Sequence, residues 1–275
     1  GLLDPYTKDS LEIYSKQRVT SFGLELLPRI TRAQTMDVLS SQANIAGYKA
    51  VLLAADAYQR FFPMMMTAAG TIRAARTLVL GAGVAGLQAI ATAKRLGSMV
   101  EAFDVRPDVK EQVESLGGVF VSVADDDAKS AQTAEGYARE MSAEYKKKQA
   151  ELIHDRAVRA DIIICTALIP NKPAPVLLPE TTVWAMKSGS IIVDLAVAAG
   201  GNCAVSEFDT VVVKDGITVI GYPNLPSLVA AEASNLYARN LLNFLGVLLD
   251  AESGSVKVNR EDDIISASLV SMDGE

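Results

Sequence analysis

The sequence of 275 residues has little of several features that would point to particular functions. Two cysteines, Cys165 and Cys203, make no disulfide framework, so we expect small buried thiols in a reducing compartment. Lysine and arginine number 26 against 33 acidic residues, and the net charge of −7 argues against a nucleic-acid partner, which requires a basic surface. The longest apolar stretch, residues 78–93, contains Gln88 and three glycines and is shorter than the roughly 20 apolar residues of a membrane-spanning helix.

Histidine is almost absent, and this limits the chemistry. The single His154 lies in a charged helical stretch, where we expect a surface helix residue rather than a catalyst. Oxidation of an alcohol or an amine needs a general acid or base, whereas hydride transfer between two nicotinamide rings needs only alignment and exclusion of water. The inventory suits the second reaction, and it suggests no metal site. The chain begins with glycine and shows no signal peptide, so we expect further sequence upstream, which could carry acid or base residues.

A glycine-rich turn stands out against this background. A short apolar run ends at Gly81, and residues 81–86, Gly-Ala-Gly-Val-Ala-Gly, lead directly into a helical pattern that continues to Leu96. Gly81 permits a tight turn, Gly83 lets the backbone approach a pyrophosphate, and Gly86 lets helix and strand pack closely. The start of the helix offers unpaired N–H groups to the phosphates. The pattern predicts a dinucleotide site.

The next apolar run, residues 99–103, ends in an acid that bears on which dinucleotide is bound. Asp104 is expected to accept hydrogen bonds from the adenosine ribose and to repel a 2′-phosphate, which favours NAD over NADP. Arg106 by itself would favour NADP. It follows the acid by two positions, so we expect it to face solvent or the pyrophosphate.

Short apolar segments alternate with helical patterns across the middle of the chain, which predicts an α/β fold with a doubly wound parallel sheet. We expect an NAD-binding Rossmann domain over residues 71–222. Residues 1–70 and 223–275 are expected to form a first Rossmann-like α/β domain that is discontinuous and incomplete at its N-terminus. The expected strands are residues 78–80, 99–103, 119–123, 162–165, 190–194 and 218–220, and the expected helices between them are residues 110–116, 138–158 and 179–187.

The flanking segments give a further set of expectations. Residues 19–26 are expected to form a strand and residues 37–62 a helix, in which small residues such as Gly47 favour close packing against another backbone. A run of methionines, residues 64–66, is expected to fill core space. Ser227 is expected to cap a long helix whose apolar side packs onto the first domain.

Two loops could be functional. Residues 27–42, here called the polar loop, carry many hydrogen-bonding side chains, but a bland alternative is a solvated loop with Thr35 as helix cap and with Arg29 and Arg32 in surface ion pairs. Residues 124–137 form an unusually long connection, either a lid or a solvated acidic insertion. The residues themselves do not decide between these alternatives.

Taken together, these motifs resemble domain I of the proton-translocating nicotinamide nucleotide transhydrogenases, and more distantly alanine dehydrogenase. The resemblance extends from Val19 to Leu245. It is carried by residues 28–48, 64–71, 81–97, 136–138, 166–170 and 194–202.

The resemblance implies an NAD(H)-binding alpha-subunit component that passes hydride to NADP(H) on a separate domain III, while a membrane domain II conducts protons. It also implies a homodimer at the cytoplasmic or mitochondrial matrix face of an energy-transducing membrane. The residues that it places at the site of hydride transfer are Arg29, Gln34, Asp37 and Ser40. Those that it places around NAD are Arg29, Ile30, Thr31, Gln34, Gly81, Gly83, Val84, Ala85, Gly86, Asp104, Val105, Arg106, Gly136, Tyr137, Gln149 and Leu168.

Two other functions remain open at this point. One is an alanine-dehydrogenase-like enzyme that reductively aminates pyruvate. The other is a catalytically silent NAD-binding module. An assay with pyruvate, ammonia and NADH separates the first from a transhydrogenase component, and an assay with domain III separates the second.

Overall fold

The structure is a computed structural model that describes residues 8–123, 142–169, 172–250 and 252–274. It divides into two units, each described here by itself. Unit 1 comprises residues 1–42 and 230–275, and unit 2 comprises residues 43–229. Gly136 and Tyr137, the expected lid residues, lie outside the described residues.

Unit 2 is built on a seven-stranded sheet among its described residues, with strand order β6-β5-β4-β7-β8-β10-β9. The neighbouring pairs from β6 to β10 are parallel, and β9 is antiparallel to β10. The predicted α/β class and the parallel sheet are confirmed, while edge strand β9 is absent from the sequence-based prediction. The strands are β4 (Arg76–Leu80), β5 (Met99–Phe103), β6 (Val119–Val121), β7 (Ile162–Cys165), β8 (Ile191–Asp194), β9 (Val211–Lys214) and β10 (Ile217–Ile220).

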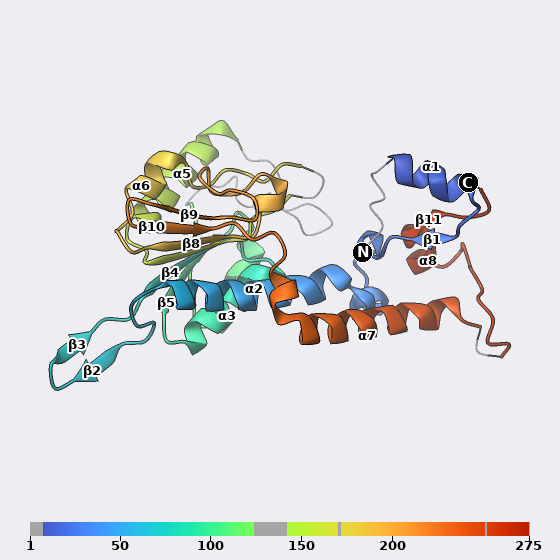
Figure 1. Cartoon of the computed structure of the whole chain (residues 1–275), viewed down its shortest axis with the longest axis horizontal. Helices are drawn as coiled ribbons and strands as arrows, with labels where there is room; N and C mark the ends of the chain where they lie inside the picture. The colour runs from blue at the N-terminus through green and yellow to red at the C-terminus, as the bar shows by residue number, and fades with distance from the viewer. Residues whose placement is uncertain (1–7, 124–141, 170–171, 251, 275) are drawn as a thin grey trace. The chain divides into compact units, whose positions relative to one another are not determined.

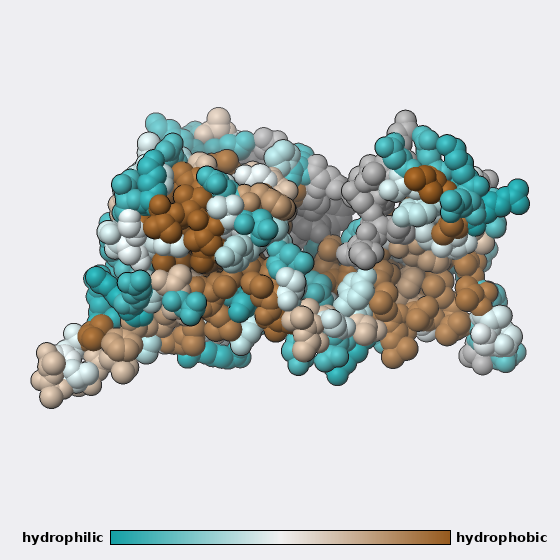
Figure 2. All heavy atoms as spheres, viewed as in Figure 1, coloured by the Kyte–Doolittle hydropathy of each residue, from teal (hydrophilic) through white to brown (hydrophobic). Residues whose placement is uncertain are grey.

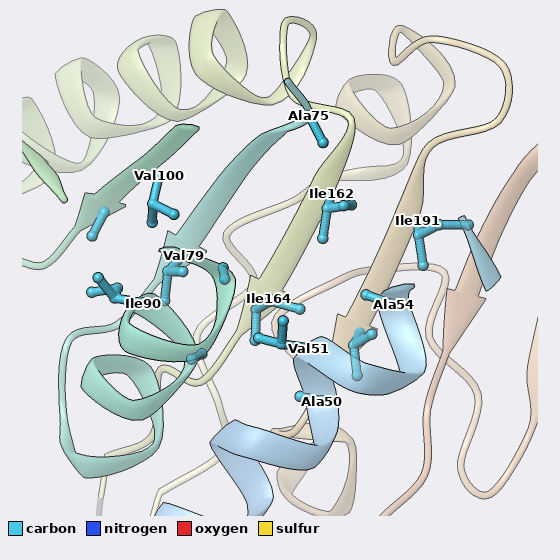
Figure 3. Packing of buried hydrophobic residues seen from close by; sticks show 14 of the residues in the cluster. Ala50, Val51, Ala54, Ala75, Val79, Ile90, Val100, Ile162, Ile164 and Ile191 are labelled. Atoms are coloured by element: carbon cyan, nitrogen blue, oxygen red, sulfur yellow. The ribbon is translucent and has the colours of Figure 1, made fainter. Parts of the chain in front are cut away.

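Helices cover both faces of this sheet, because residues along each strand alternate between two apolar cores. On β4, Val79 belongs to one core, and Leu78 and Leu80 belong to the other. Figure 3 shows Val79 among residues of α2 and α3. Figure 1 shows α2 and α3 on one side of the sheet and α5 and α6 on the other. These helices are α2 (Val38–Ala57), α3 (Val84–Arg95), α4 (Lys110–Ser115), α5 (Ala143–Ala157) and α6 (Glu180–Trp184).

The strand order places the functional edge. From β4 the chain goes first to β5 and β6 on one side and then to β7 and β8 on the other. In such sheets ligands bind beyond the carboxyl ends of the strands where the order reverses. That position is the junction of β4 with β5 and β7, and the glycine-rich turn follows β4 directly.

Two expectations around α2 are wrong. The helix ends at Ala57 rather than at residue 62, and the chain then turns to bury Tyr58 and Phe62, whose rings meet edge to face 6.1 Å apart. The methionines do not fill the core. They lie at hairpin β2 (Met65–Thr67) and β3 (Gly70–Ile72), whose residues are exposed along both strands, and Met66 is 76% exposed.

Unit 1 has its own core, formed by apolar residues of the polar loop, α7 (Ala230–Leu248) and α8 (Asp263–Ser268), with α1 (Lys8–Lys16) as a further helix. The expected strand over residues 19–26 is shorter. Only β1 (Ser21–Phe22) pairs, antiparallel with β11 (Leu269–Ser271). The chain then forms a 3₁₀ turn, Leu24–Leu26, which buries Leu24 in this core.

The long helix near the C-terminus also begins differently from the prediction. Ser227 lies in a 3₁₀ turn, η6 (Leu225–Val229), and its hydroxyl donates to the carbonyl of Asn224, 2.7 Å away, while α7 begins at Ala230. One side of α7 packs as expected onto unit 1 through Phe244 and Leu248. Among the described residues, no helix combines the length and apolar character that crossing a membrane requires.

A candidate dinucleotide site and the polar loop

The turn after β4 is dictated by backbone crowding. Gly81 has a φ of +98°, and a Cβ on Gly86 would lie 1.9 Å from the carbonyl oxygen of Gly81. The Thr166 hydroxyl, from the end of β7, closes the turn by donating to the carbonyl of Gly81 at 2.9 Å. The helix can therefore start directly on the strand only with glycine at these two positions.

The second glycine of the motif leaves open space. Gly83 precedes the first residue of α3, and the heavy atom nearest to a Cβ built on it, Nη2 of Arg106, is 3.9 Å away. The next residue, Val84, is 41% exposed. A pyrophosphate needs this close backbone approach at the start of a helix, so the turn fits a dinucleotide.

Helix α2 supports the start of α3. A Cβ on Gly47 would lie 2.0 Å from the carbonyl oxygen of Ala85, which confirms the expected close backbone packing. The Asn44 side chain donates to Gln88 of α3 at 3.3 Å. The two helices are therefore held together within the first turns of α3.

Asp104 ends β5 beside the glycine turn and is buried. Its Oδ2 accepts from the N–H of Ala82 at 2.7 Å and from Nη2 of Arg106 at 2.8 Å. Its Oδ1 accepts from the N–H and the Nε of Arg106, both at 2.9 Å. These hydrogen bonds raise the pKa of Arg106 above its ordinary value. The expectation that Arg106 faces solvent is wrong, because its side chain is only 16% exposed and folds back onto the acid.

The carboxyl ends of β7 and β8 are tied together by an asparagine that the sequence reasoning missed. Asn202 is fully buried. Its side-chain oxygen accepts from the N–H of Ala167 at 3.0 Å, and its amide donates to the carbonyls of Ala167 and Pro175, both at 2.8 Å. It thereby orders the turn that presents Leu168, which is 50% exposed. An asparagine directly after two glycines was the available signal, since such a loop needs a side chain to satisfy its backbone.

A buried acid, Asp194, holds the adjoining loop. It accepts from the N–H groups of Ala196 and Cys203 and from the hydroxyl of Ser206, at 2.8–3.0 Å. Cys203 and Cys165 are free and buried, as expected. Burial raises the pKa of the Cys203 thiol to about 11, so both the position and the protonation state argue for packing rather than reactivity.

In unit 1 the polar loop folds into a 3₁₀ helix, η2 (Thr31–Met36), followed by α2. Asp37 caps α2: its Oδ1 accepts from the N–H of Ser40 at 2.9 Å, and its Oδ2 accepts from the Ser40 hydroxyl at 2.5 Å. The expectation that Thr35 is the cap is wrong. Its carbonyl instead accepts from the side chains of Asn240 and Asn243 of α7, at 2.8 and 2.9 Å.

One expected ion pair of the polar loop is present. Arg32 makes two hydrogen bonds to Asp262, at 2.8 and 2.7 Å, and Asp262 in turn caps α8. Hydrogen bonding to Arg32 lowers the pKa of Asp262. Arg29 and Gln34 are exposed. The loop is thus fastened at its backbone and at Arg32, while other polar side chains point outward.

The structure sorts the predicted site residues into two groups by unit. Unit 2 brings together the glycine turn and the Asp104–Arg106 segment at the carboxyl edge of the sheet, where the β7 turn with Leu168 also ends. Gln149 lies on α5. His154 is also a residue of α5, near its C-terminus, with Nδ1 2.8 Å from the Thr182 hydroxyl. Unit 1 holds the residues of the polar loop, namely Arg29, Ile30, Thr31, Gln34, Asp37 and Ser40.

Comparison with known proteins identifies the family. Residues 50–275 match the family described as alanine dehydrogenase/PNT, C-terminal domain. The chain is 56% identical over 264 residues to an NAD(P) transhydrogenase subunit alpha of Rhodospirillum rubrum, covering 96% of this chain and 69% of that protein. It is 46% identical to a solved transhydrogenase from Sinorhizobium meliloti, with a TM-score of 0.88 over 99% of this chain and 73% of that one.

A more distant likeness concerns the fold alone. A solved L-alanine dehydrogenase shares 21% identity and a TM-score of 0.76, covering 98% of this chain and 70% of the other. The sequence identities above are far higher for the transhydrogenases. The chain therefore belongs to the family of NAD(P) transhydrogenase alpha subunits.

Proposed function

We propose that the chain is the NAD(H)-binding component of a proton-translocating transhydrogenase. In this role it holds NAD(H) for direct hydride transfer to or from NADP(H) on a separate domain III. Proton movement takes place through a membrane domain of the same complex. The observation that carries the proposal is the glycine turn beside buried Asp104, at the reversal point of a parallel sheet in a chain 56% identical to a transhydrogenase alpha subunit.

Within unit 2, we assign the pyrophosphate to the glycine turn. The backbone N–H groups at the start of α3, residues 84–86, face the space that Gly83 leaves open. Asp104, with Val105 and Arg106, holds the adenosine end, and Leu168 borders the site from the end of β7. Gln149, Gly136 and Tyr137 complete the proposed set. We assign the NAD-binding domain to residues 71–222.

The polar loop is proposed to act at the nicotinamide. Bound NADH supplies a hydride, so the protein must align the donor ring and keep water out rather than supply a proton. Arg29 and Gln34 are exposed on a backbone fixed by η2, which suits groups that bind the carboxamide and ribose. Asp37 and Ser40 are joined to each other at the start of α2, and together they can hold one orientation of the carboxamide.

The proposed partners are a second copy of this chain, domain III and membrane domain II. Support for the homodimer comes from α7, whose buried side packs within unit 1 while leucines remain exposed on its other side. Figure 2 shows apolar residues gathered over the α7 region. The exposed leucines are Leu241, Leu242, Leu245 and the following Leu249. We place the chain at the cytoplasmic or matrix face of the membrane complex.

The test is to express this chain within its full-length protein and to measure binding and transfer. Calorimetry is expected to show NADH binding and much weaker NADPH binding. Mixed with purified domain III and NADPH, the protein should reduce an NAD analogue. Tighter NADPH than NADH binding, or no transfer with an active domain III, would overturn the proposal. Reductive amination of pyruvate by the protein alone would favour the alanine-dehydrogenase alternative.

A further inference from the structure

The hydrogen bonds on Asp104 use up its capacity to accept more. A carboxylate offers about four lone-pair sites. Among the described residues, two backbone N–H groups and two N–H groups of the Arg106 side chain donate to it, two to each oxygen. The backbone donors, from Ala82 and Arg106, are fixed by the turn. A ribose hydroxyl can therefore reach Asp104 only when the Arg106 side chain gives up a place.

The Arg106 side chain also lies where a nucleotide is expected. Its Nη2 is the heavy atom nearest to a Cβ built on Gly83, at 3.9 Å, so the guanidinium stands over the open part of the glycine turn. A guanidinium is planar and presents paired N–H donors that match phosphate oxygens as well as they match a carboxylate. An arginine near the acidic position is the usual means by which such folds accommodate a 2′-phosphate.

We propose that Asp104 makes this site selective for NAD(H) by holding Arg106, and that Arg106 released from Asp104 binds the 2′-phosphate of NADP(H). Discrimination then has two parts. Asp104 neutralises the neighbouring guanidinium by a two-point contact, and its own charge repels a phosphate whenever that contact opens. The inference rests on the proposed NAD(H) site and extends it to specificity.

The experiment compares Asp104→Asn with the double variant Asp104→Asn/Arg106→Gln in the full-length protein. The amide of Asp104→Asn can still accept from the N–H of Ala82 but no longer pairs with a cation. We expect NADPH and 2′,5′-ADP to bind at least about 10-fold more tightly to the single variant, since a charge-assisted contact is worth about one to two powers of ten in affinity. The double variant should lose this gain. NADH binding should weaken in both.

A matched control is Asp161→Asn. Asp161 is also buried, accepts from the N–H of Arg76 at 2.9 Å, and pairs with Lys187 at 3.0 Å, but it precedes β7 at the opposite edge of the sheet. Its loss should lower thermal stability without increasing affinity for 2′,5′-ADP. An equal increase in this control would overturn the inference.

The outcomes separate the inference from the proposed function. Wild-type protein that fails to bind NADH contradicts the function itself. A folded Asp104→Asn that gains no affinity for NADPH, or a double variant that keeps the gain, contradicts only the role of Arg106. If Asp104→Asn fails to fold, Arg106→Lys tests the same point. A lysine cannot make the two-point contact, so the ratio of NADPH to NADH dissociation constants should fall at least about threefold, and an unchanged ratio would overturn the inference.

Discussion

The glycine turn of unit 2 and the polar loop of unit 1 are both made of a short segment that ends at the start of a helix, but they are specified differently. In the glycine turn, crowding between Gly81 and Gly86 leaves no room for another side chain. In the polar loop, the backbone is fixed by Asp37 and by bonds from α7 to the carbonyl of Thr35, while Arg29 and Gln34 are exposed. One segment is constrained by what it lacks, and the other by what its side chains hold.

The difference decides how far function can be inferred from each. Backbone crowding has few solutions, so a glycine pattern beside a strand and an acid indicates a dinucleotide site in any protein. Exposed polar side chains have many uses, and nothing local to residues 29–40 distinguishes a nicotinamide site from a solvated loop. Only the resemblance to a family assigns the polar loop a role in the reaction.

The largest expected effect comes from breaking the glycine turn. Gly86→Ala would place a Cβ against the carbonyl of Gly81, and the overlap can be relieved only by moving α3 away from β4. We expect a loss of about 2–3 kcal/mol in unfolding free energy and of about 100-fold in NADH affinity, since overpacking against backbone costs this much. Calorimetry and thermal unfolding measure both.

A glycine outside any turn supplies the contrast. Gly246 lies within α7, and a Cβ built on it meets nothing within 4 Å. Gly246→Ala should stabilise the protein by up to about 1 kcal/mol, because alanine is the better helix former. If both variants behaved alike, the crowding argument for the turn would be wrong.

The polar loop should respond in rate rather than in stability. Gln34 is exposed, so Gln34→Asn, which shortens the side chain by one methylene, should change the unfolding free energy by less than about 0.5 kcal/mol. If Gln34 aligns the two rings, hydride transfer to domain III should slow about 10- to 100-fold while NADH affinity changes much less. Stopped-flow transfer and calorimetry separate the two quantities, and equal losses in both would contradict the alignment role.

Asp37 allows the structural and chemical roles of the loop to be separated. Asp37→Ala removes the cap of α2 and should cost about 1 kcal/mol of stability, whereas Asp37→Asn keeps a capping oxygen and should cost only a few tenths. Urea unfolding measures this. A rate loss in Asp37→Asn without a stability loss would support a role at the nicotinamide. Unchanged transfer in that variant would leave Asp37 as a helix cap alone.

Most of unit 2 was predictable from sequence, for a physical reason. Its buried strands are short apolar runs, and an apolar run between helical patterns has few other structures available. The cap of α2 was assigned to Thr35 instead of Asp37 because both residue types accept hydrogen bonds. The fold of Arg106 onto Asp104 was missed because a contact two residues apart depends on the bend after β5, which spacing does not show.

The smallest expected effect concerns the ion pair that fastens the polar loop. The pKa of Asp262 is lowered by Arg32, so the pair stabilises the folded protein above the ordinary aspartate pKa of about 3.9 and loses this contribution as pH falls through the lower folded value. Arg32→Gln should therefore reduce stability at pH 6 slightly and make its decline below pH about 4 shallower. The glycine turn contains no titrating group in residues 81–86, so Gly86→Ala should shift the whole pH profile without changing its slope. Urea unfolding between pH 6 and 3 compares the variants, and parallel profiles for Arg32→Gln and wild type would show that this pair does not stabilise the loop.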